Sequence, residues 1–259
     1  KADNMFQITP SASAAKVIAN DNCFQVCFTD PNQGTASADY IASKGLATKV
    51  AVIYNSSDAY SSGIYDNFKA EAAAKGLDLV ASEAFTGDSK QDFSSQLSKI
   101  KASGAELIFL PIYYQEASLI LSQAKNAGIT AKFFGCDGLD GLLNIENFDK
   151  SLAENVMLLT PFAANATDET TKKFVAAYNA KYDPSTLNQF AADAYDAVYI
   201  VKAAAEKAGV TGDMSVSDIC NAITVDGVTG SGMTWKATGE VNKEPKAVKI
   251  ENGEYQPMD

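Results

Sequence analysis

The chain has 259 residues, too many for one small core and enough for two α/β lobes. Hydrophobic residues make up 46% and charged residues 20%, an ordinary balance for a folded protein, and no apolar run is long enough to span a bilayer. The net charge of -11 argues against nucleic acid as a partner, because phosphate binding needs a basic surface. The sequence contains no histidine, which excludes Ser-His-Asp and Cys-His catalysis and any metal site that needs an imidazole.

The four cysteines are Cys23, Cys27, Cys136 and Cys220. Cys23 and Cys27 belong to one extended run, in which four residues separate the Cα atoms by about 13 Å, too far for a disulfide. All four are therefore predicted to be reduced and mostly buried thiols, and they say little about the compartment of the protein.

Two strands are predicted in the first 30 residues, at 5–9 and 23–29, with a Ser/Ala-rich turn and a helix between them. Apolar strands and amphipathic helices then alternate through residues 48–137. The expected strands are 49–54, 77–82, 106–111 and 131–136, and the expected helices are 61–75, 92–102 and 115–127. The strands begin near 49, 78, 106 and 131, in steps of 25 to 29 residues, the length of a βα unit. This alternation predicts a parallel sheet covered on both faces.

The last hundred residues have a different pattern. Helices are predicted at 167–182, 188–208 and 215–223, and strands at 232–236 and 246–251. Three proline-containing segments fit the crossings of a hinged two-lobe protein, because proline interrupts regular structure. These segments are 30–32, 160–162 and 244–246, and ordinary loop prolines would give the same pattern.

Ligands of open parallel sheets bind beyond the carboxyl ends of the strands, so the residues that follow each strand are candidates. Ser11 and Ser13 follow the first strand, residues 55–60 follow the strand at 49–54, Tyr113 follows the strand at 106–111, and Asp137 follows the strand at 131–136. Hydroxyls and backbone amides near a helix start suit a carboxylate, whereas Asp137 suits an ammonium. Together these groups fit a zwitterion.

Each of these residues also has an ordinary structural interpretation. The serines and residues 56–58 could be helix N-caps, the Asp137-Gly138 pair could be a turn, and the tyrosines could pack in the core. Two enzyme-like strings are rejected because they lack the motifs that accompany them in enzymes: residues 13–16 (SAAK) and 230–232 (GSG).

The chain resembles the periplasmic-binding-protein type I family, in particular the Leu/Ile/Val-type solute-binding proteins of ABC importers. The resemblance extends nearly from end to end, and it is carried by residues 6–13 (FQITPSAS), 28–34 (FTDPNQG), 50–54 (VAVIY), 92–94 (DFS), 133–138 (FFGCDG) and 235–240 (WKATGE). It implies an α/β fold of two Rossmann-like lobes with parallel sheets. The first lobe is expected to comprise 1–31 and 161–245, and the second 32–160 and 246–259. The family's opening strand–helix units have no counterpart, so the first lobe is expected to be incomplete in this chain.

The resemblance also implies a ligand site, residue by residue. The turn of Ser11, Ala12 and Ser13 would hold the α-carboxylate of an amino acid. Asp137 would pair with the α-ammonium, although glutamate is usual there. The aromatic residues Tyr60, Tyr113 and Phe190 would pack around the ligand, with a loop-length difference near Phe190.

The resulting expectation is a receptor without enzymatic activity, cofactor or metal. It would capture a small or branched-chain apolar amino acid between two lobes and deliver it to an ABC importer. The protein is expected to be extracytoplasmic, in the periplasm or on the cell surface by a lipid anchor upstream of this chain, and to be a monomer when complete. The alternatives are the same fold binding an amide, urea or aromatic acid as a sensor, an α/β hydrolase or transferase, and a fragment that acts as an assembly or regulatory module.

Overall fold

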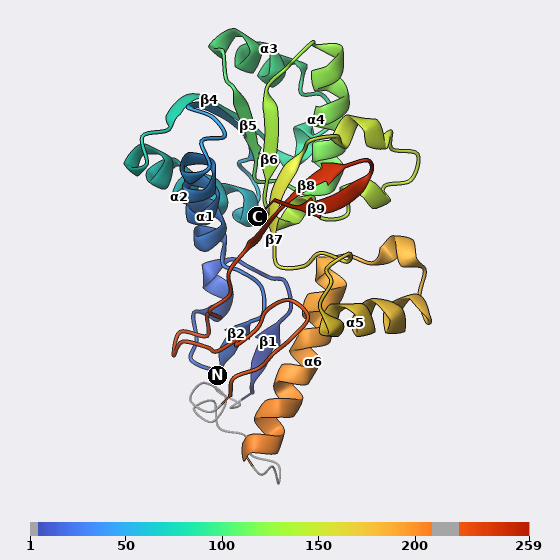
Figure 1. Ribbon diagram of the computed structural model, residues 1–259. Coiled ribbons are helices and arrows are strands. Elements are labelled where there is room, and N and C mark those ends of the chain that lie inside the picture. The colour runs from blue at the N-terminus through green and yellow to red at the C-terminus, as the bar shows by residue number, and fades with distance from the viewer. Residues whose placement is uncertain (1–4, 209–222, 259) are drawn as a thin grey trace. The chain divides into compact units, whose positions relative to one another are not determined.

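The computed structural model describes residues 5–208 and 223–258, which form two compact units (Figure 1). Unit 1 comprises Lys1–Thr29 and Pro161–Pro245, and unit 2 comprises Asp30–Thr160 and Lys246–Asp259. The chain therefore passes between the units at residues 29/30, 160/161 and 245/246. The helix predicted at 215–223 lies outside the described residues except for its last position.

Unit 2 contains a seven-stranded sheet in the order β4-β3-β5-β6-β7-β8-β9. Its first five strands are mutually parallel, as the βα spacing predicts, whereas β8 pairs antiparallel with β7 and β9 pairs antiparallel with β8. The strands are β3 (Lys49–Asn55), β4 (Asp78–Phe85), β5 (Leu107–Leu110), β6 (Lys132–Gly135), β7 (Met157–Thr160), β8 (Lys246–Glu251) and β9 (Glu254–Pro257). The helices are α1 (Asp30–Ser43), α2 (Ala59–Ala74), α3 (Ser94–Ser103) and α4 (Tyr114–Asn126).

The central strands of unit 2, such as β5 and β7, are buried on both faces of the sheet, to which their successive side chains point in turn. Val52 and Phe109 pack with Ile64 and Phe68 of α2, on the face that α1 and α2 cover. Figure 1 shows α4 on the other side of the sheet, and the intervening strand residue Ile108 is fully buried as well. Continuous apolar strands such as β5 require this two-sided cover.

Unit 1 contains a parallel pair of short strands, β1 (Gln7–Thr9) and β2 (Cys23–Gln25). The 3-10 helix at Ala15–Ile18 connects them, and two helices follow later in the chain, α5 (Glu169–Asn179) and α6 (Gln189–Ala208). Phe24 packs with Ile200 of α6 and with Trp235, whose indole N–H donates to the Gln25 carbonyl at 2.8 Å. This cluster is a core of unit 1, separate from that of unit 2.

Several predictions of local structure are wrong. Residues 30–32 do not interrupt regular structure, because they form the first turn of α1, where proline costs no intrahelical hydrogen bond. The sequence predicted no helix there because α1 is mostly polar. The helix is stabilised by its contact with α2. Gly34 permits that contact: a Cβ on Gly34 would lie 2.4 Å from the Ile64 carbonyl oxygen. Residues 232–236 contain only isolated β-bridges, at Met233 and Trp235, and the strands β7 and β9 were not predicted.

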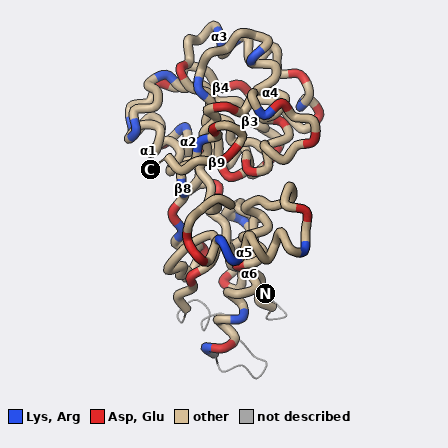
Figure 2. Tube along the Cα trace, turned by 45° about the vertical axis from the view of Figure 1, so that its right-hand side comes forward, with Lys and Arg blue, Asp and Glu red and all other residues tan. Residues whose placement is uncertain are grey.

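Acidic and basic residues are interspersed over both units (Figure 2). Within the described residues, the helices lack the combination of length and apolar character that crossing a membrane requires. Cys23, Cys27 and Cys136 are buried and are not joined in disulfides, while Cys220 lies outside the described residues.

Candidate functional site

Three of the sequence-predicted site residues follow neighbouring strands of unit 2. Tyr60 is in the first turn of α2, after β3, and Asp58 caps that helix by accepting the Ser61 N–H at 3.3 Å. Tyr113 is the extended residue immediately before α4, after β5. Asp137 begins a 3-10 helix, Asp137–Leu139, after β6. Because parallel strands end at the same edge of the sheet, the fold brings all three together.

Tyr60 joins these residues into one cluster. Its hydroxyl donates to Asp137 Oδ1 at 2.7 Å and accepts the Gly138 N–H at 2.9 Å. Its ring stacks on Tyr113, with ring centroids 4.8 Å apart. Only glycine fits at position 138, because a Cβ there would lie 2.6 Å from the Tyr60 hydroxyl and 2.7 Å from the Ile112 carbonyl oxygen.

The cluster is electrically negative and its phenols stay protonated. Burial and the nearby Asp137 carboxylate raise the pKa of Tyr60 well above its ordinary value. The pKa of Tyr113 is also raised, by burial and then by the charges of Asp58, Asp137, Asp30 and Glu116. Tyr60 is therefore a hydrogen-bond donor to Asp137, and Asp137, only 4% exposed, is a carboxylate suited to a cationic partner.

Gln33 is a site residue that sequence reasoning did not identify. It lies in α1 and is 4% exposed, and its Oε1 accepts the backbone N–H of Asp137 at 3.4 Å. Its Nε2 is buried without a hydrogen-bond partner, so it is a donor beside Asp137 that the chain leaves unused. The available signal was its place in the segment 28–34, one of those that carry the family resemblance.

The other sequence-predicted residues lie in unit 1. Ser11, Ala12 and Ser13 form the turn after β1, in which Ser11 and Ala12 are exposed and Ser13 is buried. The Ala12 N–H donates to Thr9 Oγ1 at 3.0 Å, and the Ala12 carbonyl accepts from Gln25 at 2.8 Å. The following 3-10 helix has Ala14 as its N-cap, so neither serine caps it. Because Thr9 already binds the Ala12 amide, a carboxylate would have to displace that bond or use other donors of the turn.

Phe190 is half-buried in the first turn of α6, on a different element from the turn at 11–13. Its neighbour Gln189 is fully buried, so the helix start is anchored in unit 1. In the parts of the chain that the structure describes, no group of three or more histidine, cysteine or acidic residues is placed to hold a metal ion.

The model of the family described as "Periplasmic binding protein" matches residues 1–254, and the chain belongs to this family. Its members bind substrates for transporters and are not enzymes. The chain is 32% identical over 214 residues to the Leu/Ile/Val-binding protein homolog 3 of Brucella melitensis, covering 82% of this chain and 56% of the relative. It is 29% identical over 232 residues to the leucine-, isoleucine-, valine-, threonine- and alanine-binding protein of Pseudomonas aeruginosa, covering 88% and 61%. The chain thus spans less than two thirds of the length of these relatives.

Solved structures have the same fold. A leucine-binding protein of Thermotoga maritima has a TM-score of 0.87 and 26% identity, over 100% of this chain and 73% of the other. The branched-chain amino acid transporter substrate-binding protein of Streptococcus pneumoniae, in complex with isoleucine, has a TM-score of 0.84 and 28% identity, over 98% and 72%. A Rhodopseudomonas palustris solute-binding protein in complex with benzoate has a TM-score of 0.85 but only 17% identity, over 99% and 71%, so it supports the fold alone.

Proposed function

We propose that this protein is an extracytoplasmic receptor that binds a small or branched-chain apolar amino acid and delivers it to an ABC importer. The observation that carries the proposal is the buried Asp137 carboxylate, held by the Tyr60 hydroxyl at 2.7 Å at the carboxyl edge of the sheet. A buried carboxylate favours a ligand with an ammonium group over one without it. The two relatives are named for binding leucine, isoleucine and valine, which agrees with this preference.

In this proposal Asp137 pairs with the α-ammonium, and the turn of Ser11, Ala12 and Ser13 meets the α-carboxylate. Tyr113 and Phe190 contact the apolar part of the ligand. Tyr60 acts mainly through Asp137, because both its donor and its acceptor are already engaged within unit 2. The family's transporters would receive the bound amino acid, and the amino-acid complex would be the form that the importer recognises.

An aromatic acid is the second candidate, since a neighbour with the same fold binds benzoate. Asp137 and the acidic groups around Tyr113 disfavour it, because benzoate is an anion without an ammonium group. An amide or urea would carry no charge, and it would leave the carboxylate without a cation.

Calorimetric titration of the ligand-stripped protein tests the proposal. Leucine, isoleucine, valine, alanine and threonine are the ligands, and benzoate, urea and acetamide are the comparison set. Binding of at least one amino acid and of none of the comparison set is expected. Binding of benzoate alone would replace the proposal by the second candidate.

Asp137→Asn tests the role of the carboxylate. Loss of a charge-assisted hydrogen bond should weaken amino-acid binding by about 10-fold to 100-fold. Binding of 4-methylpentanoate, which is leucine without its ammonium group, should not weaken. Asp140→Asn is the matched control, because Asp140 is a buried acid of the same unit that lies beside Tyr255. Equal losses for both ligands, or for both variants, would refute the role of Asp137.

A further inference from the structure

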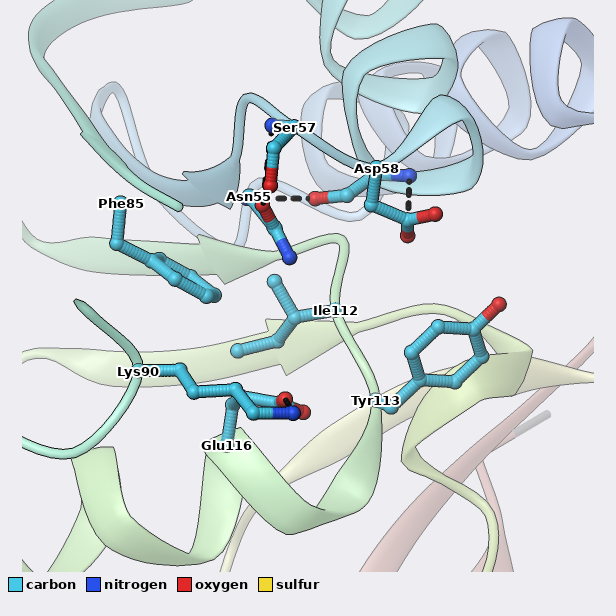
Figure 3. A pocket seen from close by; sticks show the side chains of 9 residues that line it. Asn55, Ser57, Asp58, Phe85, Lys90, Ile112, Tyr113 and Glu116 are labelled. Atoms are coloured by element: carbon cyan, nitrogen blue, oxygen red, sulfur yellow. Dashed lines mark hydrogen bonds and ion pairs between the residues drawn. The ribbon is translucent and has the colours of Figure 1, made fainter. Parts of the chain in front are cut away.

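A cavity of about 260 Å³ lies beside Tyr113, at the carboxyl ends of β3, β4 and β5 (Figure 3). Phe85, Ile112 and the ring of Tyr113 form its apolar walls, and Asp58, Glu116 and Lys90 contribute charges. A water molecule in the liquid occupies about 30 Å³, so the cavity has room for a ligand of several non-hydrogen atoms. All of these residues belong to unit 2.

Glu116 is the unusual residue of this cavity. It lies in the first turn of α4 and is only 9% exposed. Its Oε1 lies 3.4 Å from the ammonium of Lys90, a side chain that is about half exposed. Its Oε2 is buried and has no hydrogen-bond partner. A buried carboxylate oxygen without a donor is costly, so the Glu116 carboxylate is short of one N–H or O–H donor.

The charges of the lining favour a cation in this place. The carboxylates of Asp58 and Glu116 outnumber the single ammonium of Lys90 among the lining residues. Burial raises the pKa of Tyr113, and the charges of Asp58 and Glu116 are among those that raise it further. The aromatic faces of Phe85 and Tyr113 can accept an alkylammonium as well as its hydrocarbon tail. A metal ion is a poor occupant, because no group of three acidic, thiol or imidazole ligands is placed to hold one within residues 5–208 and 223–258.

We propose that this cavity is a second binding site, which takes the primary ammonium group of a small alkylamine on Glu116. The N–H groups of the ligand donate to the Glu116 carboxylate, Asp58 adds to the attraction, and the tail packs on Phe85 and Ile112. A quaternary ammonium cannot make the first of these contacts, since it has no N–H. The site uses a different carboxylate from the one assigned to the amino acid, so it does not rest on the proposed function.

Titration of the full chain with n-butylammonium chloride, followed by amide and side-chain NMR, tests the inference. Saturable shifts centred on Asn55, Tyr113 and Glu116 are expected, and sodium chloride and tetramethylammonium chloride at equal concentration should not produce them. Glu116→Gln, which keeps the shape and removes the charge, should weaken binding at least about tenfold. Glu83→Gln is the matched control, because Glu83 also pairs with a lysine, Lys99, but lies outside the cavity. This variant should bind as the wild type does.

A second variant keeps Glu116 and changes its partner. Lys90→Gln removes the competing ammonium and should raise the affinity for n-butylammonium severalfold. The inference is overturned if the shifts are absent, which would mean that Lys90 serves both oxygens of Glu116. It is equally overturned if the shifts persist in Glu116→Gln, if Lys90→Gln lowers the affinity, or if only Asp137→Asn removes the binding.

Discussion

Two buried carboxylates, Asp196 of unit 1 and Glu116 of unit 2, differ in how completely the chain supplies them with hydrogen-bond donors. Asp196 on α6 of unit 1 accepts the N–H groups of Val228 and Thr229, each at 2.8 Å, and the Thr229 hydroxyl at 2.6 Å. Gly227 makes the close approach possible, because a Cβ there would lie 2.5 Å from Asp196 Oδ2. Glu116 of unit 2, by contrast, has one oxygen on Lys90 and one without a partner.

The same contrast holds for the cations. Lys243 of unit 1 has a fully buried side chain, which donates to Thr229 at 2.6 Å and to Asp193 at 3.2 Å. Lys90 of unit 2 is about half exposed and reaches Glu116 only at 3.4 Å. Asp196 and Lys243 of unit 1 thus connect distant segments of the chain, whereas Glu116 at the carboxyl edge of unit 2 keeps one oxygen without a hydrogen-bond partner. Substitutions at Asp196 and Lys243 should therefore change mainly stability, and substitutions at Glu116 should change mainly ligand binding.

Lys243→Met should have the largest effect on stability. It removes a cation from Asp193, which is 1% exposed, and breaking a buried pair typically costs about 3–5 kcal/mol. Urea denaturation followed by tryptophan fluorescence measures it, because Trp235, the single tryptophan, lies in unit 1. Lys202→Met is the control: it removes a lysine from an exposed pair with Glu206 and should change the midpoint little. Similar midpoints for the two variants would break the comparison.

Tyr60→Phe should have an intermediate effect, felt in both stability and binding. It removes the donor to Asp137 and the acceptor of the Gly138 N–H, which together should cost about 1–3 kcal/mol of unfolding free energy. Amino-acid affinity should fall as well, because Asp137 loses the group that orients it. Tyr65→Phe on the same helix is the control, since its ring would still stack on Tyr54. Unchanged affinity in Tyr60→Phe would show that Asp137 needs no such support.

Glu106→Gln should have the smallest effect on stability, and this effect should be lost at acidic pH. The N–H groups of Thr48 and Lys49 and the Thr48 hydroxyl hold the pKa of Glu106 below its ordinary value of 4.5. A lowered pKa in the folded state gives stability that is present above pH 4.5 and is lost as the pH falls through the folded value. The difference in urea midpoint between wild type and Glu106→Gln should therefore be present at pH 7 and shrink toward pH 3. A difference that is independent of pH would contradict this assignment.

The sequence by itself determined the βα units of unit 2, because apolar periodicity and strand spacing are local properties. It also determined which residues follow the strand ends, and so it nominated Tyr60, Tyr113 and Asp137. It did not predict α1, because α1 is polar and is stabilised by its packing on α2. It also did not predict the short strands β7 and β9. The strand predicted at 232–236 is wrong, because this segment forms only two isolated β-bridges, at Met233 and Trp235.

Only the tertiary structure decided which hydrogen bonds connect the residues of the site. The bond between Tyr60 and Asp137 joins residues 77 positions apart, and Gln33 reaches Asp137 across 104 positions. The burial of Glu116 with one oxygen that lacks a hydrogen-bond partner depends on α4 and on the loop that carries Lys90. Hydrogen bonding and desolvation depend on distances between segments, which no local pattern encodes, whereas the order of strands and helices follows from the pattern of apolar residues.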